Sequence, residues 1–319
     1  MGRASRTKHD LDHRQKIAAQ RAAARHAQER NRLLLAFGAI MTVVAVTVAI
    51  VLVKTFSPST PTAPPSGGLT GTALANTVKD LTTVPASVLD AVGGGSLVAG
   101  DIGSATAVGE GYLTPVSGAP LTAGGKPEVL YVGADYCPYC AAVRWPLIVA
   151  LSRFGTFSGL STTRSAITNG AGQHEPYPST ATWTFYGSGY TSQYLTFTAV
   201  ETTTNVPDPA SGTYTVLQTP TAAQLATLDK YDTGGGIPFV DVGNKYVQLS
   251  TLAPYGPQDL QGMTWSQIAA TLRDPSSTPG KGIDASANYL TAAICTLTAN
   301  QPASVCTPAI TALQPRLGS

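Results

Sequence analysis

Four cysteines stand in two pairs of different spacing. Cys137 and Cys140 enclose a Pro-Tyr dipeptide and form a Cys-x-x-Cys motif, whereas ten residues separate Cys295 from Cys306. Two intervening residues bring both sulfurs of the first pair onto one helical turn, so they can close a small disulfide. Such a disulfide exchanges with other disulfides through its thiolate form. The first pair therefore predicts thiol–disulfide exchange chemistry.

The segments on either side of the first pair place it at the start of a helix. Residues 129–133 form a short apolar run typical of a buried strand, and residues 141–154 have helical composition, with Pro146 expected to kink the helix. The unpaired N–H groups and the dipole of a helix N-terminus stabilise a thiolate there. We therefore expect Cys137 to be the nucleophile and Cys140 the resolving thiol.

The residues inside and beside the motif are expected to tune it. Pro138 fixes the turn and removes a backbone N–H, and Tyr139 exchanges no proton near neutral pH and shapes the entrance. Two acids, Glu128 and Asp135, lie close by in the sequence. We favour solvated charges or turn residues for both over a role in proton transfer.

Three alternative roles for the motif stay open on the sequence alone. A zinc site would need two more ligands, but the second cysteine pair is distant and only His174 lies outside the N-terminal tail, so we expect no metal. A purely structural disulfide is the second alternative. The third is a retired active site within a binding domain.

The wider sequence around the motif resembles a known superfamily. Residues 129–154 resemble the strand, Cys-x-x-Cys motif and helix of the thioredoxin superfamily, and Cys-Pro-Tyr-Cys is the arrangement seen in glutaredoxins. Ile237 and Pro238 resemble the cis-proline that faces the disulfide in that fold. The larger pattern is similar to an uncharacterised family of membrane-anchored thioredoxin-like proteins of actinobacteria and archaea, a domain of unknown function. The segments that carry this similarity are 125–131, 136–142 and 152–155.

The resemblance implies a fold and a site over residues 127–273. It implies an α/β, thioredoxin-like fold in which Pro238 shapes the substrate site and keeps metal away from the cysteines, with Tyr136 and Ile237 beside it. Thioredoxins carry a buried acid six residues before the first cysteine, where this chain has Tyr131, and an insert of about 80 residues precedes the proline. These departures favour an oxidant or isomerase over a general reductant.

The second cysteine pair flanks a turn between two expected helices, residues 285–297 and 306–314. A disulfide between Cys295 and Cys306 would pin this C-terminal hairpin, and we favour this structural role. A relay that exchanges with the first pair is the alternative. The oxidising side of a membrane suits both roles.

The first 53 residues of the chain indicate a membrane anchor. Residues 1–32 hold nine of the 20 Lys and Arg residues, and residues 33–53 are free of charge and long enough, at about 31 Å, to span a bilayer. The basic flank places the N-terminus in the cytoplasm and the remainder outside. It indicates topology rather than nucleic-acid binding. A cleaved signal peptide is the competing interpretation, but the run is longer than usual and no Ala-x-Ala pattern follows.

The remaining segments complete the expected organisation. One short helix is expected at 85–92, strand structure at 180–203, a helix at 221–230, a hairpin over 237–249 with a Gly-Asn turn, and a helix at 264–272 capped by its first residue. Trp145, Trp183 and Trp265 are expected in the core. The predicted parts are a cytoplasmic tail (1–32), a transmembrane helix (33–53), a Pro/Ser/Thr-rich linker (54–72), an N-terminal extension packing on the domain (73–126), the thioredoxin-like domain (127–273) and a C-terminal helical extension (274–319).

These inferences combine into one functional hypothesis. We expect a single-pass membrane protein whose extracytoplasmic domain oxidises or isomerises cysteine-containing exported proteins, without an organic cofactor. Its partners would be the membrane, those exported proteins and a membrane redox protein, quinone-coupled, that reoxidises the pair. The alternative is a non-catalytic thioredoxin-like interaction module in an envelope complex. The two differ in whether the first cysteine pair exchanges with other proteins.

Overall fold

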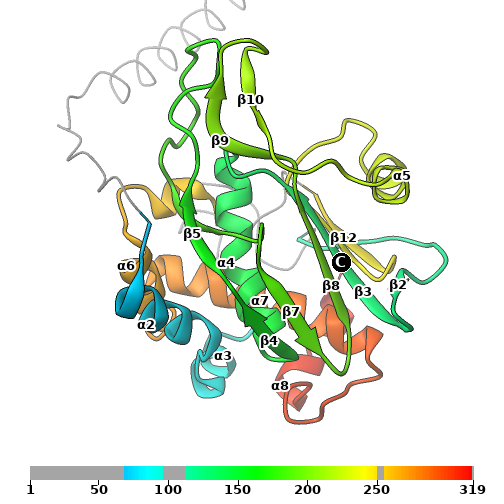
Figure 1. Cartoon of the computed structure of the whole chain (residues 1–319). Helices are drawn as coiled ribbons and strands as arrows, with labels where there is room; N and C mark the ends of the chain where they lie inside the picture. The colour runs from blue at the N-terminus through cyan, green and yellow to red at the C-terminus, as the bar shows by residue number, and fades with distance from the viewer. Residues whose placement is uncertain (1–67, 96–111, 250–254, 318–319) are drawn as a thin grey trace, which may run out of the picture. The chain divides into compact units, whose positions relative to one another are not determined.

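A central mixed sheet organises the part of the chain that the computed structural model describes (Figure 1). Strand β3 (Lys126–Gly133) lies at its centre and is antiparallel to β11 (Phe239–Val242) and parallel to β8 (Thr196–Glu201). Strand β12 (Tyr246–Gln248) continues the sheet beyond β11. Two short strands complete it, β1 (Thr114–Pro115) beside β12 and β2 (Thr122–Ala123) beside the start of β3. The described residues are 68–95, 112–249 and 255–317.

Both faces of β3 are buried, which explains its uninterrupted apolar sequence. Side chains alternate along a strand, so Val129 and Tyr131 enter the larger hydrophobic core, whereas Leu130 and Val132 enter a smaller one. The larger core contains α4 and α7, and the smaller one contains Leu228 of α5. In Figure 1, α5 accordingly lies on the other side of the sheet from α4 and α7. The mixed α/β class predicted from the sequence is confirmed.

Two long helices form the centre of the larger core. Helix α4 (Pro138–Ser152) continues through Pro146 and packs against α7 (Thr278–Leu297). The prediction of two C-terminal helices, 285–297 and 306–314, is wrong in their lengths. Helix α7 begins seven residues earlier than expected and is buried along most of its length, whereas α8 (Pro308–Thr311) is a single turn followed by the 3-10 turn η2 (Gln314–Arg316). The C-terminal segment thus supplies part of the core.

Seven short strands and helix α5 make up the regular structure of the long insert between α4 and β11. The stretch 180–203, expected to be strand, contains β6 (Ala181–Thr184), β7 (Gly189–Ser192) and β8. Strand β6 pairs with β5 (Ser161–Arg164) and β7 with β4 (Gly155–Ser158). Strands β9 (Thr203–Asp208) and β10 (Thr213–Val216) form a separate antiparallel hairpin beyond β8. The insert therefore forms paired strands around the helix that carries the first cysteine pair.

Local signals predicted several element ends correctly. Helices α5 (Ala222–Tyr231) and α6 (Trp265–Thr271) each begin after a threonine whose side chain accepts a hydrogen bond from a backbone N–H, with a glutamine completing a capping box. The hairpin β11–β12 turns through Gly243 and Asn244, both with positive φ, which these residue types tolerate. Trp145, Trp183 and Trp265 are all buried, as expected.

The sequence analysis missed one helix at the start of the described chain. Helix α2 (Gly71–Thr82) begins within the segment assigned to the linker and buries Leu81 against the core, packing on α4 and α6. Its three threonines and its first-position glycine weaken the helical signal, so tertiary packing stabilises it. Helix α3 (Ala86–Val92) follows with Pro85 at its N-cap, and the 3-10 turn η1 (Pro257–Leu260) precedes α6.

The predicted membrane anchor lies outside the described residues, together with the basic tail and most of the linker. Within 68–95, 112–249 and 255–317, no helix combines the length and apolar character needed to cross a bilayer. The anchor and its orientation stay predictions from the sequence.

Candidate active site

Cys137 is the N-cap of α4, the position that its sequence neighbours predicted. Its sulfur accepts a hydrogen bond from the backbone N–H of Cys140 at 3.3 Å, and Pro138 occupies the first helical position. Proline suits this position because its missing N–H would have no partner within the helix. The two sulfurs are not bonded to each other. The chain therefore holds a dithiol at the positive end of a helix.

The two thiols differ in their ionisation. A hydrogen bond from the Cys140 thiol, the Cys140 backbone N–H and the charge of Arg144 lower the pKa of Cys137, although burial opposes them. Burial, together with the neighbouring Cys137 sulfur, raises the pKa of Cys140 well above its ordinary value. Cys137 is therefore the thiol that ionises first, which is what a nucleophile in front of a resolving thiol requires.

Exposure follows the same order. Cys137 retains 5% of its surface, whereas Cys140 is completely buried. A partner sulfur can therefore approach only the first cysteine from outside. The approach is narrow, because the Ile237 carbonyl lies 3.9 Å from the Cys137 sulfur.

The structure brings Ile237 and Pro238 to the cysteines from 100 residues away in the sequence. They directly precede β11, which pairs with β3, and β3 leads into the Cys-x-x-Cys turn. The Ile237–Pro238 peptide is cis. Sheet pairing thus places the Ile-Pro segment beside the sulfur, where the resemblance to thioredoxins locates it.

Four tyrosines frame the entrance, two of them supplied by the insert. Tyr136 stacks on Tyr214 of β10, with ring centroids 4.2 Å apart, and Tyr139 meets Tyr177 edge to face. Tyr139 is 42% exposed. The backbone N–H of Ala166 also donates to the Tyr136 carbonyl. The sequence pointed to Tyr136 and Tyr139, but nothing in it placed the other two tyrosines here.

A buried ion pair beneath the cysteines is the main feature that the sequence analysis missed. Arg144 of α4 donates to both carboxylate oxygens of Glu201 of β8, at 2.9 and 2.7 Å, and both side chains are completely buried. Arg144 also donates to the Ala134 carbonyl at 2.8 Å. The available signal was a lone basic residue within an apolar helix and a lone acid at the end of an apolar strand.

Asp135 is a turn residue, one of the two roles predicted for it, but it belongs to the same buried cluster and is not a solvated charge. It is only 8% exposed, and its carboxylate lies 3.6 Å from the Arg144 guanidinium. Burial raises its pKa to about 6, against the lowering effect of Arg144. The backbone N–H of Asp135 donates to the Thr203 carbonyl, which holds Asp135 at the end of the sheet. Glu128 differs, because it is partly exposed and accepts a hydrogen bond from Thr198.

Tyr131 stands six residues before Cys137, where the resemblance to thioredoxins implies a buried acid, and it cannot supply the chemistry of an acid. It is completely buried, and burial raises its pKa well above the ordinary value. Its ring lies 5.8 Å from the Arg144 guanidinium carbon. Gly133 leaves room for its hydroxyl, because a Cβ there would collide with it. The charged groups beneath the cysteines therefore come from α4, β8 and the turn after β3.

Comparison with known proteins locates the site within an uncharacterised domain. Residues 112–216 match a family described as a domain of unknown function (DUF929). The matched segment contains the Cys-x-x-Cys motif and both members of the buried ion pair, and it ends before the Ile-Pro segment. No curated protein and no solved structure shows significant similarity to the chain.

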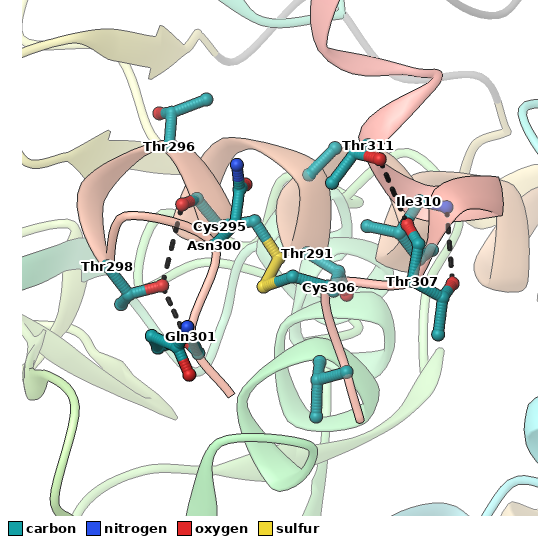
Figure 2. Close-up of a disulfide and its surroundings, with 12 residues drawn as sticks. Thr291, Cys295, Thr296, Thr298, Asn300, Gln301, Cys306, Thr307, Ile310 and Thr311 are labelled. Carbon is teal, nitrogen blue, oxygen red and sulfur yellow. Dashed lines mark hydrogen bonds between the residues drawn. A yellow bond between two sulfur atoms is a disulfide. The ribbon is translucent and has the colours of Figure 1, made fainter. Parts of the chain in front are cut away.

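The second cysteine pair forms a disulfide at the end of α7 (Figure 2). Thr298 closes the following turn by donating to the Gln301 carbonyl at 2.6 Å. Arg153, the C-cap of α4, donates to the Val305 carbonyl beside Cys306. Cys137 caps the other end of the same helix, about 24 Å away at 1.5 Å per residue. The two pairs lie at opposite ends of α4, so a direct relay would require a large rearrangement.

Other ligand chemistry finds little support in the described residues. Within them, no group of three or more His, Cys, Asp or Glu side chains is arranged to hold a metal ion. His174 is exposed in the insert, in a short bridge with Thr168. The Cys137–Cys140 pair with its charged support is the chemically distinctive site.

Proposed function

We propose that this chain is a membrane-anchored thiol–disulfide oxidoreductase with a thioredoxin-like domain on the extracytoplasmic side. The observation that carries the proposal is the asymmetry of the first cysteine pair. Cys137, which keeps 5% of its surface exposed, has a lowered pKa, and Cys140, completely buried, has a raised one. The Ile-Pro segment beside Cys137 and the match to the family of unknown function are compatible with this proposal.

The chemistry is an exchange of sulfur–sulfur bonds. In the oxidising direction, a substrate thiolate attacks Cys137 of the closed pair, and Cys140 leaves as a thiolate that takes up a proton. A second substrate thiolate then attacks the substrate sulfur of the mixed disulfide and releases the Cys137 thiolate. The substrate gains a disulfide and the pair gains two electrons. A membrane redox partner, quinone-coupled, would accept these electrons.

Isomerisation uses the same atoms without net electron transfer. The Cys137 thiolate attacks a wrong substrate disulfide, and another substrate thiolate later displaces it. Stabilisation of the Cys137 thiolate favours the reduced form of the pair. The pair is therefore better suited to oxidising or isomerising substrates than to reducing them. The substrates we propose are exported proteins that contain cysteines.

A trapping experiment tests the proposal. A Cys140→Ser chain in its native envelope keeps the nucleophile but cannot resolve mixed disulfides, so we expect covalent complexes with exported proteins on non-reducing gels. The Cys137→Ser/Cys140→Ser chain is the matched control and should trap none. Failure of the single variant to trap any exported protein would refute the proposal.

One observation favours the alternative of a non-catalytic interaction module. Cys137 is 5% exposed and its sulfur lies 3.9 Å from the Ile237 carbonyl, so access is restricted. In that case the pair would serve as a structural disulfide that supports a docking surface. A reduction potential below about −300 mV, combined with an unreactive Cys137, would favour this role.

A further inference from the structure

Arg144 lies on the cysteine-bearing side of α4. It follows Cys140 by four residues and Cys137 by seven, and these spacings place all three on one helical face. The guanidinium is completely buried two turns below the N-terminus of the helix. The cation is therefore fixed beneath the dithiol, inside the apolar core, where charge is screened least.

The contacts of Arg144 connect it to the turn that carries the cysteines. The Ala134 carbonyl accepts from Arg144 and also from the backbone N–H of Cys137, at 3.3 Å. Glu201 holds the other side of the guanidinium with two hydrogen bonds, and its carboxylate also accepts from the Phe185 N–H. A bidentate pair fixes the plane of the guanidinium.

This arrangement leaves buried polar atoms without a hydrogen bond in the charged cluster. Within the described residues, the second terminal nitrogen of Arg144 (Nη1), one carboxylate oxygen of Asp135 (Oδ1) and the Tyr131 hydroxyl are buried and form no hydrogen bond. A purely structural ion pair would be expected to satisfy its own donors. A guanidinium with one unsatisfied nitrogen, on the same face of α4 as the two thiols, is instead suited to a negative charge that appears on one of them.

We propose that Arg144 is a positioning residue that holds positive charge under the Cys137–Cys140 pair, and that Glu201 sets how much of this charge the sulfurs experience. Together they bias the pair toward its reduced form and make it an oxidant of partner thiols. The charged and titratable groups facing the guanidinium are Tyr131 of β3, Asp135 of the following turn, both cysteines of α4 and Glu201 of β8. This inference rests on the proposed function and specifies its direction of electron flow.

The test measures how fast iodoacetamide alkylates Cys137 across pH in the purified full-length chain, followed by mass spectrometry. Glu201→Gln removes the negative charge beside Arg144, so the rise of the Cys137 alkylation rate with pH should move to lower pH. Arg144→Met/Glu201→Gln removes both charges and keeps the site neutral, so the profile should move to higher pH, with alkylation about tenfold slower on its rising side. The glutathione-equilibrated potential of the double variant should fall.

Two further variants separate charge from packing. Arg144→Lys keeps the positive charge, so its alkylation rate should depend on pH nearly as in the unmodified chain. Arg153→Met makes a similar change at the other end of the same helix, and it should leave the profile unchanged. Near-UV circular dichroism checks that each variant is folded.

Opposite movements of the first two profiles support the inference, because a purely structural role would move both in one direction. Unchanged profiles, or movement in one direction, overturn it. If the double variant does not fold, the Glu201→Gln profile decides alone, and no movement to lower pH overturns the inference. These readouts need no exported substrate, so a failed trapping experiment would refute the proposed function and leave this result standing.

Discussion

The two ends of α4 place cysteines in opposite surroundings. At the N-terminal end, unbonded Cys137 and Cys140 lie over a buried cluster of charged groups, some of whose polar atoms have no hydrogen-bond partner within the described residues. At the C-terminal end, bonded Cys295 and Cys306 lie in the apolar core beside Arg153, which donates its hydrogen bonds to neutral acceptors. The same residue type thus serves two purposes. Its surroundings decide whether a sulfur is prepared for ionisation or only for bonding.

Removal of sulfur at each end is the largest expected contrast. Cys137→Ser should lower exchange by at least about a thousandfold, because the nucleophile is lost. Cys295→Ala/Cys306→Ala should leave exchange nearly unchanged. The measurement is oxidation of a reduced cysteine-containing peptide with glutathione disulfide as the terminal oxidant. Equal losses in both variants would show that the comparison drawn between the pairs is wrong.

Stability should respond in the reverse order. The second disulfide closes a loop with a sequence separation of 11, so Cys295→Ala/Cys306→Ala should lower the free energy of unfolding by about 3 kcal/mol. Urea titration followed by tryptophan fluorescence measures the loss, with the reduced wild-type chain as a second reference. Cys137→Ala should cost clearly less, because no crosslink is lost. A smaller loss for the disulfide variant would contradict the structural role of this pair.

The pH dependence of stability gives the smallest and most specific contrast. The folded pKa of Asp135 is about 6, above its ordinary 3.8, so the folded chain binds this proton more tightly than the unfolded chain. The corresponding stability is complete below about pH 4 and is lost as pH rises through about 6. Relative to Asp135→Asn, the wild type should therefore lose up to about 2 kcal/mol over this range.

The Asp135→Asn comparison also removes a background contribution. Burial raises the pKa of Asp241 to about 6 as well, but this residue titrates in both proteins and cancels in the difference. Urea titrations at several pH values between 4 and 7 provide the curves. Parallel curves for the two proteins would show that Asp135 is not part of the buried charged cluster.

Local physics allowed the sequence to predict much of the framework. The apolar run of β3, the threonine cap of α6, and the Gly-Asn turn between β11 and β12 all depend on residues close together in the chain. The same holds for Cys137 at the start of α4, because the Cys-Pro sequence itself supplies the cap and the first helical residue. Helix α2 was missed because its stability comes from packing on α4 and α6.

Only the tertiary structure decided how the cysteines are surrounded. Sheet pairing brings Ile237 beside a sulfur 100 residues away, and the parallel register of β3 and β8 carries Glu201 to Arg144. A sequence shows that a lone charge lies in an apolar segment, but the cost of burying it is relieved only by a partner on another element. The candidate reactive residues were therefore readable from their spacing, whereas their charge environment depended on which strands became neighbours.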